Sequence, residues 1–163
     1  MAGNLDTARF RVILSHQLKV PIDKTETFVL GSHGDTMVPI VSKTFIDGRP
    51  LRGMMHKDMV DRMIKITKSR GGQIVALLKS GSAYFSPSAA CLEILKAVVN
   101  DEKKIIPCSC VLDGEYGLAD CAIGVPAKIG KEGIEEIVEW ELTPEETEAL
   151  KNSARQMKEM VAL

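Results

Sequence analysis

The chain has 163 residues, of which 45% are hydrophobic and 26% are charged, and its formal net charge is −1. This length suits one domain, 1–163, that can bury a hydrophobic core. The balanced charge gives no indication of a nucleic-acid partner or of a membrane-surface partner. No apolar run approaches the roughly 20 residues that span a bilayer, and the N-terminus lacks the regions of a secretory signal. We therefore expect a cytoplasmic protein.

The four cysteines are interpreted as reduced, mostly buried thiols, as is typical of a cytosolic protein. They are Cys91, Cys108, Cys110 and Cys121. One residue separates Cys108 from Cys110, whereas zinc ligands are usually separated by about two to four residues. A disulfide or a metal site is the less favoured alternative, and we expect no metal.

The first third of the chain predicts one long helix followed by short strands. Apolar residues at helical spacing predict a helix over 5–19. A β-rich segment, 27–30, then leads into the glycine-rich turn 31–35. Residues 38–46 predict a strand, and Asp47-Gly48 is a hairpin turn signal that ends it.

Two further helices are predicted in the middle of the chain. Apolar residues within 59–66 indicate the first of them, which the pair Gly71-Gly72 is expected to interrupt. A short helix over 74–78 would follow this break. Pro87 suits the first turn of another long helix, which ends near Val98.

The last third predicts three antiparallel strands, over 104–112, 118–128 and 135–142. Asp113-Gly114 and 130–133 supply the turns between them. Antiparallel strands next to each other along the chain need only such short connections.

The run Thr143-Pro144-Glu145-Glu146 then predicts the start of a final helix, which continues to about Met160. It offers a capping residue, a proline at the first position and acids in the first turn. The order helix, strands, helices, strands, helix indicates an α+β fold rather than alternating βαβ units. No Gly-x-Gly-x-x-Gly follows a predicted strand, so the usual turn that binds dinucleotide phosphates is not expected here.

His33 is the first candidate for chemistry. It lies in a glycine-rich turn after a strand, where a side chain can face a cleft. Histidine is suited to proton transfer near neutral pH. The alternative is a turn histidine without a chemical role.

Asp6 and Arg9 are the other candidates, and their spacing places both on one face of the first helix. The carboxylate can accept a hydrogen bond from an imidazole nitrogen and fix its tautomer. The guanidinium can bind a carboxylate through two parallel hydrogen bonds. The alternatives are an acid that interacts with the helix dipole and a surface arginine paired with a neighbouring acid.

Taken together, these motifs resemble the substrate-binding and catalytic domain of the lactate/malate dehydrogenase family. The resemblance rests first on the run Asn4-Leu5-Asp6-Thr7-Ala8-Arg9-Phe10-Arg11 and on Gly31-Ser32-His33-Gly34-Asp35. The segment Leu78-Lys79-Ser80-Gly81-Ser82-Ala83 is similar to the one that closes the family's substrate pocket, and 111–117 and 123–126 are similar to its late hairpin. The resemblance covers essentially the whole chain. It implies the family's C-terminal domain fold, with antiparallel strands packed on long helices and without the Rossmann domain.

The resemblance also implies roles for the candidate residues. His33 would take the hydroxyl proton of a small 2-hydroxy acid while hydride passes to NAD, and Asp6 would orient His33. Arg9 would bind the substrate carboxylate, and Ser82 would add a polar contact. NAD would be bound mainly by the family's N-terminal Rossmann domain, which is absent from this chain and is the implied partner. The family also implies a homo-oligomer.

Malate is the preferred substrate, because Met1-Ala2-Gly3 resembles a run found before the first motif in the malate-using branch. Without a cofactor domain, the chain by itself is expected to be inactive. Two alternatives stay open: the catalytic domain of an L-lactate dehydrogenase, and a non-catalytic module that self-associates.

Overall fold

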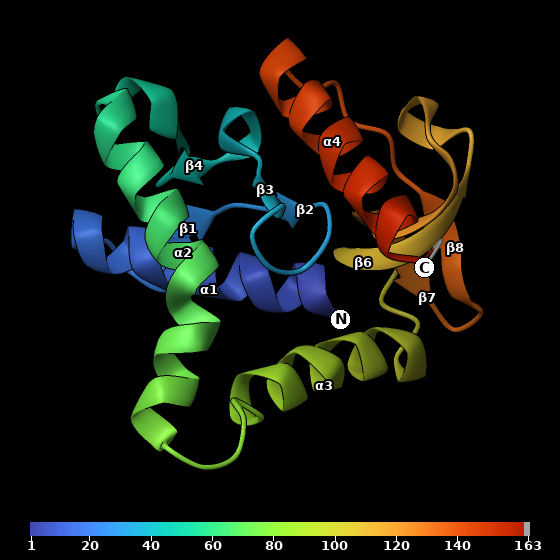
Figure 1. The fold of residues 1–163 in the computed structure, drawn as a ribbon, viewed down its shortest axis with the longest axis horizontal. Coiled ribbons are helices and arrows are strands. Elements are labelled where there is room, and N and C mark those ends of the chain that lie inside the picture. The colour runs from blue at the N-terminus through green and yellow to red at the C-terminus, as the bar shows by residue number, and fades with distance from the viewer. Residues whose placement is uncertain (162–163) are drawn as a thin grey trace.

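The computed structural model describes residues 1–161 and has the α+β architecture expected from the sequence (Figure 1). The long helices are α1 (Ala2–Leu18), α2 (Lys57–Leu78), α3 (Phe85–Val99) and α4 (Pro144–Val161). The largest sheet is antiparallel and has the order β6 (Lys104–Asp113), β7 (Ala119–Gly130) and β8 (Gly133–Ile137). These long elements confirm the predicted fold class.

Short elements fill the segment between α1 and α2. Strand β2 (Val29–Leu30) pairs with β3 (Val38–Pro39), and β4 (Phe45–Ile46) lies between β1 (Thr25–Glu26) and β5 (Arg49–Pro50). Single 3₁₀ turns occur at Ile22–Lys24, Val41–Lys43, Leu51–Gly53 and Glu115–Gly117.

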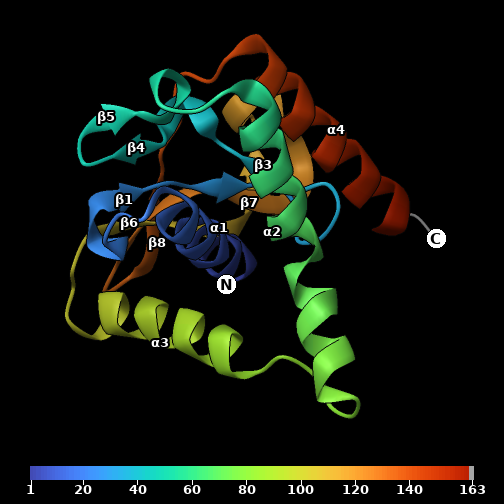
Figure 2. The same ribbon diagram turned by 90° about the vertical axis from the view of Figure 1, so that its left-hand side faces the viewer.

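Helix α1 lies at the centre of the fold, where it contacts α2, α3, β2 and β6 (Figure 2). Its side chains Phe10 and Leu14 are fully buried. It crosses β6 closely at Gly3, since a Cβ atom there would lie 3.0 Å from the Cβ atom of Pro107. The side-chain amide of Asn4 donates to the carbonyl oxygen of Ala90 at 3.2 Å, which ties α1 to α3.

Two hydrophobic clusters form the core. One lies between the large sheet and α4, and includes Ile106, Leu112, Ile123, Val125 and Leu150. The other lies between α1, α2 and the short strands, and includes Phe10, Leu14, Val29, Ile46, Leu51 and Met63. Strand β2 connects the two clusters, because Leu30 belongs to the first and Val29 to the second.

The predicted interruption at Gly71-Gly72 is wrong, because α2 continues through both glycines to Leu78. A glycine within a helix costs about 1 kcal/mol relative to alanine, which packing readily offsets. The packing explains Gly71, since a Cβ atom there would lie only 3.3 Å from Nη1 of Arg9. The glycine therefore leaves room for the guanidinium and does not end the helix.

The predicted strand over 38–46 is also divided. Its start pairs with β2, its end pairs with β1, and a 3₁₀ turn separates the two. The Thr44 hydroxyl donates to the carbonyl oxygen of Ile40 at 2.8 Å across this turn, and it also bonds the hydroxyl of Thr27 at 2.8 Å. These buried side-chain bonds favour the turn over a continuous strand.

The last predicted strand begins earlier and ends earlier than expected, since β8 is Gly133–Ile137. Beyond it, the Tyr116 hydroxyl donates to the carbonyl oxygen of Val138 at 2.9 Å and accepts from the N–H of Trp140 at 2.9 Å. A side chain therefore satisfies backbone groups that a strand partner would otherwise bond.

The predicted cap of α4 is confirmed. The Thr143 hydroxyl accepts the N–H of Glu146 at 3.3 Å, and the Glu146 carboxylate accepts the N–H of Thr143 at 3.1 Å. This reciprocal pair is a capping box. The same carboxylate accepts the N–H of Ser42 at 2.9 Å, so the cap also fixes the segment after β3.

Gly124→Ala is expected to destabilise the fold. Gly124 and Gly31 exchange two backbone hydrogen bonds, of 2.8 and 3.1 Å, and a Cβ atom at position 124 would lie 2.5 Å from the Gly31 carbonyl oxygen. Overpacking of this kind costs about 1–3 kcal/mol, which urea unfolding can measure. Gly72→Ala is the control, because no atom lies within 4 Å of a Cβ atom there and the helix gains propensity. Equal stability of the two variants would contradict the close approach.

Candidate active site

Asp6 and His33 form the central contact of the site. The Nδ1 atom of His33 lies 2.8 Å from Oδ2 of Asp6. The Asp6 side chain is 2% exposed, whereas that of His33 is 48% exposed. A buried carboxylate thus holds one nitrogen of the imidazole, and the other nitrogen is left to exchange a proton.

The two side chains meet because α1 is tied to β2. The Thr7 hydroxyl oxygen accepts the N–H of Val29 at 2.9 Å, in a fully buried bond. Asp6 directly precedes Thr7, and the loop that carries His33 directly follows β2 (Figure 1). One hydrogen bond therefore sets the position of the carboxylate relative to the imidazole.

The base of the His33 loop is fixed from the far end of the chain. Gly31 has φ of 83° and forms a bridge with Gly124 of β7. The buried Ser153 of α4 accepts the N–H of Ser32 at 2.9 Å, and its hydroxyl lies 3.2 Å from that of Thr36. The loop is thus attached to both β7 and α4.

Arg9 lies beside this pair and is not fully bonded. Its Nη1 atom is 3.6 Å from Oδ1 of Asp6, and its side chain is 9% exposed. The Nε atom of Arg9 and Oδ1 of Asp6 are buried without a hydrogen-bond partner. Buried donors are nearly always satisfied in folded proteins, so the unpaired Nε, together with the long 3.6 Å contact of Nη1, indicates that the guanidinium can bind a further anion.

A cavity of about 390 Å³ brings these groups together. Arg9, His33 and Ser82 all line it, and Asp6 lies behind His33. The other lining residues are Met1, Leu5, Gly34, Lys68, Gly71, Gly72, Val75, Ala83 and Pro87. The structure therefore places every residue that the sequence singled out at one site.

Lys68 also lines the cavity, and the sequence analysis did not identify it. It lies on the same helical face as Gly71, Gly72 and Val75, at spacings of three, four and seven residues. That pattern signals a shared face only when α2 is continuous. Because the sequence predicts a helix break at Gly71-Gly72, Lys68 and Val75 are not expected on one helical face.

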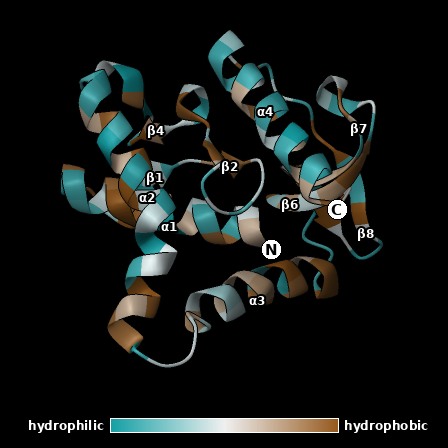
Figure 3. Ribbon diagram, in the orientation of Figure 1, coloured by the Kyte–Doolittle hydropathy of each residue, from teal (hydrophilic) through white to brown (hydrophobic). Residues whose placement is uncertain are grey.

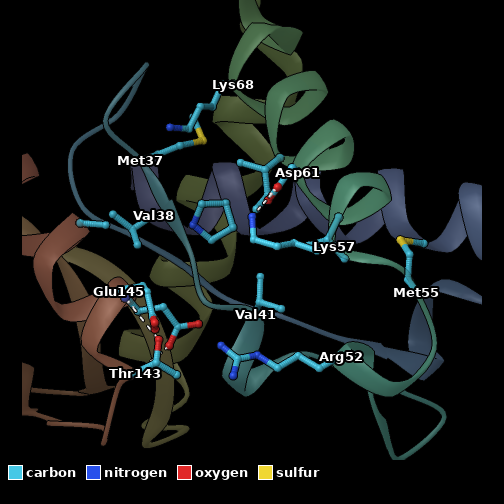
Figure 4. A pocket seen from close by; sticks show the side chains of 15 residues that line it. Met37, Val38, Val41, Arg52, Met55, Lys57, Asp61, Lys68, Thr143 and Glu145 are labelled. Carbon is cyan, nitrogen blue, oxygen red and sulfur yellow. Dashed lines mark hydrogen bonds and ion pairs between the residues drawn. The ribbon is translucent and has the colours of Figure 1, made fainter.

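A larger groove of about 690 Å³ lies between α2, α4 and the segment after the His33 loop (Figure 4). Its charged groups are largely satisfied by one another or by the backbone. Lys57 pairs with Asp61 at 2.6 Å, and the Glu146 carboxylate accepts two bonds from Ser42. We therefore place the candidate active site in the smaller cavity, where polar atoms are left open.

The described residues meet the requirements of neither a metal site, nor a disulfide, nor a membrane span. Within residues 1–161, no group of three or more His, Cys, Asp or Glu side chains could hold a metal ion. All four cysteines are free thiols; three are buried and Cys91 is exposed. Burial raises the pKa of Cys110 to about 11. None of the described helices is long and apolar enough to cross a membrane.

The pKa values of the buried carboxyl groups Asp6 and Glu146 are shifted in opposite directions. Burial raises the pKa of Asp6 above 3.8, although the hydrogen bond with His33 and the charge of Arg9 act in the opposite direction. Burial acts in the same way on Glu146, but hydrogen bonds from Ser42 and the Thr143 backbone outweigh it and lower the pKa of that group below 4.5.

This difference predicts opposite pH dependences for two variants. Because the folded-state pKa of Asp6 is raised, its contribution to stability is fully present below pH 3.8 and is lost as pH rises through the folded pKa. The stability of Asp6→Asn relative to the wild type should therefore increase as pH rises from 3 to 7. Glu146→Gln should show the reverse, since Glu146 contributes stability above pH 4.5 that is lost on acidification.

Urea unfolding at a series of pH values measures both differences. The two slopes should have opposite signs. A slope of the same sign for both variants, or no slope for Asp6→Asn, would show that burial does not control the Asp6 carboxyl group.

Comparison with known proteins agrees with the resemblance noted in the sequence. The family model described as lactate/malate dehydrogenase, alpha/beta C-terminal domain, matches residues 3–163. A malate dehydrogenase of Chlorobium phaeobacteroides (strain BS1) is 46% identical over 154 residues, which cover 94% of this chain and 50% of that relative. The chain spans about half the length of the curated relatives it matches.

Solved structures of malate dehydrogenases and of lactate dehydrogenases are similar to this fold. A malate dehydrogenase from Salinibacter ruber has a TM-score of 0.95 and 40% identity, over 99% of this chain and 53% of that one. A lactate dehydrogenase from Cryptosporidium parvum, in complex with lactic acid and nicotinamide adenine dinucleotide, has a TM-score of 0.94 and 34% identity, over 98% of this chain and 52% of that one.

Proposed function

This chain belongs to the lactate/malate dehydrogenase family, and from that premise we propose that it is the substrate-binding and catalytic domain of an NAD-dependent malate dehydrogenase. The domain comprises residues 1–163. The observation that carries the proposal is the 2.8 Å contact between Asp6 and His33 at a cavity that Arg9 also lines. The reaction interconverts malate and oxaloacetate, a step of the tricarboxylic acid cycle.

His33 is the proposed catalytic acid and base. During oxidation, the imidazole nitrogen that does not contact Asp6 accepts the hydroxyl proton of the substrate, and in the reverse direction it returns that proton. The Asp6 carboxylate accepts a hydrogen bond from the Nδ1–H of His33 and stabilises the charged ring. Since Asp6 is nearly inaccessible to water, this bond also fixes the orientation of the ring.

Arg9 is the proposed group that binds the substrate carboxylate. Its guanidinium lies at the cavity, beside the pair that transfers the proton, and its partial pairing with Asp6 leaves donors for a second anion. Two parallel hydrogen bonds orient a planar carboxylate, which places the adjacent hydroxyl carbon near His33. Ser82, which lines the same cavity, adds a polar contact.

The apolar residues Leu5, Val75 and Pro87 line this cavity and would receive the nicotinamide ring of NAD. When bound, it supplies the acceptor of hydride from the substrate carbon. No turn suited to its phosphates was found in the sequence, so the N-terminal Rossmann domain of the family is the proposed holder of the rest of the cofactor and a partner of this chain.

Malate is preferred over lactate because the similar curated relatives from two strains of Chlorobium phaeobacteroides are malate dehydrogenases. An L-lactate dehydrogenase is the second candidate, favoured by the close likeness to the lactate dehydrogenase of Cryptosporidium parvum. A non-catalytic module that self-associates is the third, because the described surface exposes many apolar side chains.

Several of those exposed apolar side chains lie on α3 and at the end of α2, where Figure 3 shows hydrophobic residues along both ribbons. Leu77, Phe85 and Val99 are each at least 80% exposed. Large apolar side chains left exposed on consecutive helices favour a partner that covers them, and we propose that the Rossmann domain and a second subunit do so in a homo-oligomer. The proposed enzyme is cytoplasmic and has no nucleic-acid or membrane partner.

We expect residues 1–163 by themselves to form no NADH from malate and NAD, because they contain no turn suited to the phosphates of the cofactor. Addition or fusion of the N-terminal half of a close malate dehydrogenase should produce turnover. Malate and lactate should be assayed in parallel, since a higher kcat/KM for lactate would favour the second candidate. Turnover by the chain alone would contradict the proposal that the N-terminal domain binds most of the cofactor. Inactivity of a folded fusion on both substrates would contradict the catalytic proposal.

In the complemented enzyme, Arg9→Lys should lower kcat/KM for malate by about tenfold to hundredfold. Lysine keeps the charge but loses one of two charge-assisted hydrogen bonds, each worth roughly 1.5–3 kcal/mol. Arg155→Lys, on the exposed face of α4, is the matched control and should have no effect. Unchanged kinetics of Arg9→Lys would show that Arg9 does not bind the substrate carboxylate.

A further inference from the structure

We propose that Lys68 is a positioning residue for His33. Its ammonium group on α2 holds the tip of the loop over 33–37 by donating a hydrogen bond to the Asp35 carbonyl oxygen, at 2.5 Å. The loop in turn presents His33 to Asp6. The consequence for catalysis rests on the proposed function, whereas the consequence for the loop does not.

The two ends of the loop are fixed differently. Its base is attached to β7 and α4 through Gly31 and Ser32. Its tip projects from these elements toward α2, with Gly34 at φ of 109°. Within the described residues, the Asp6–His33 contact joins the loop to α1, the 3.2 Å contact between the hydroxyls of Thr36 and Ser153 joins it to α4, and the bond from Lys68 joins it to α2. Removal of the Lys68 bond would release the loop at Asp35, between the two other attachments.

The ammonium group of Lys68 has no competing carboxylate partner among residues 1–161. Asp61, an acid that lines the same groove, is already paired with Lys57 at 2.6 Å. Lys68 is half-buried as a residue, and its ammonium group donates, in an exposed bond, to a neutral carbonyl oxygen of the loop rather than to a carboxylate.

Lys68 also lies between the two hollows of the surface. It lines the 390 Å³ cavity with Arg9 and His33, and it lines the 690 Å³ groove with Met37. Figure 4 shows Lys68 and Met37 at the same end of that groove. Met37, which ends the loop, is 3% exposed. The aliphatic stem of Lys68 can therefore stay packed in a variant that loses only the ammonium group.

The test compares Lys68→Met with Lys68→Arg in this chain. Methionine keeps an unbranched apolar stem and removes the donor, whereas arginine keeps a cationic donor. Lys65→Met, on an exposed position of the same helix, is the matched control. Amide hydrogen exchange at Met37, whose N–H donates to the Gly34 carbonyl oxygen at 3.2 Å, should be about tenfold faster in Lys68→Met, because a lost contact raises the population of the locally open loop. Lys68→Arg and Lys65→Met should exchange as the wild type does.

The NMR signal of the His33 imidazole in Lys68→Met should change with the loop, and thermal unfolding should confirm that the rest of the fold is intact. If Lys68→Met does not fold, Lys68→Leu, which also lacks a donor, provides the same exchange measurement. Unchanged exchange and an unchanged imidazole signal in a folded variant without the ammonium group would overturn the proposal.

The complemented enzyme supplies a second readout. Lys68→Met should lower kcat about tenfold with little change in KM for malate, because Arg9 still binds the substrate, and Lys68→Arg should restore kcat. A raised KM with normal kcat would overturn the positioning role, since it would indicate direct substrate contact. An inactive wild-type enzyme would contradict the proposed function, but the exchange experiment would still decide the role of Lys68.

Discussion

The burial of helix α1 is the constraint on which the rest of this structure depends. One side of the helix places Phe10 and Leu14 in the core without exposure to solvent. Asp6 lies one turn before Phe10 on the same face and is itself buried, and Arg9, beside it, lines the cavity. Because packing density leaves little freedom for a core helix to shift, the hydrophobic contacts also set where the carboxylate and the guanidinium lie. The Thr7 bond to β2 then relates this helix to the loop that carries His33.

Within the described residues, three buried side-chain atoms have no hydrogen-bond partner: two belong to Asp6 and Arg9 at the site, and the third is Nε of Arg11. Oδ1 of Asp6 and Nε of Arg9 are buried without partners, and each unsatisfied group costs about 1–3 kcal/mol. The raised pKa of Asp6 has the same physical cause, because burial disfavours its charged form. Local departures of this kind are expected where a sequence serves chemistry rather than stability. A substrate carboxylate at Arg9 would relieve part of the cost.

The His33 loop draws its support from three distant parts of the chain. Gly124 of β7 and Ser153 of α4 hold its base, and Lys68 of α2 holds its tip. Each support comes from an element that also contributes to the core or to the cavity wall. This arrangement explains how a short, glycine-rich loop can keep an imidazole within 2.8 Å of a buried carboxylate. Geometry at that precision is what proton transfer requires.

The sequence by itself determined the features that depend on neighbours along the chain. The capping box at Thr143 and Glu146 and the helical spacing of Asp6 and Arg9 are local patterns, and the structure contains both. The motifs also identified three of the groups at the cavity before any contact was known. Tertiary structure decided the rest. Gly71 predicts a helix break from the sequence alone, whereas in the structure it makes room for the Arg9 guanidinium within a continuous helix. Lys68 has no local signature, because its partner is a backbone carbonyl 33 residues away. The physical reason is the same in both cases: propensity is worth about 1 kcal/mol per residue, and a packing contact or a buried hydrogen bond from a distant segment outweighs it.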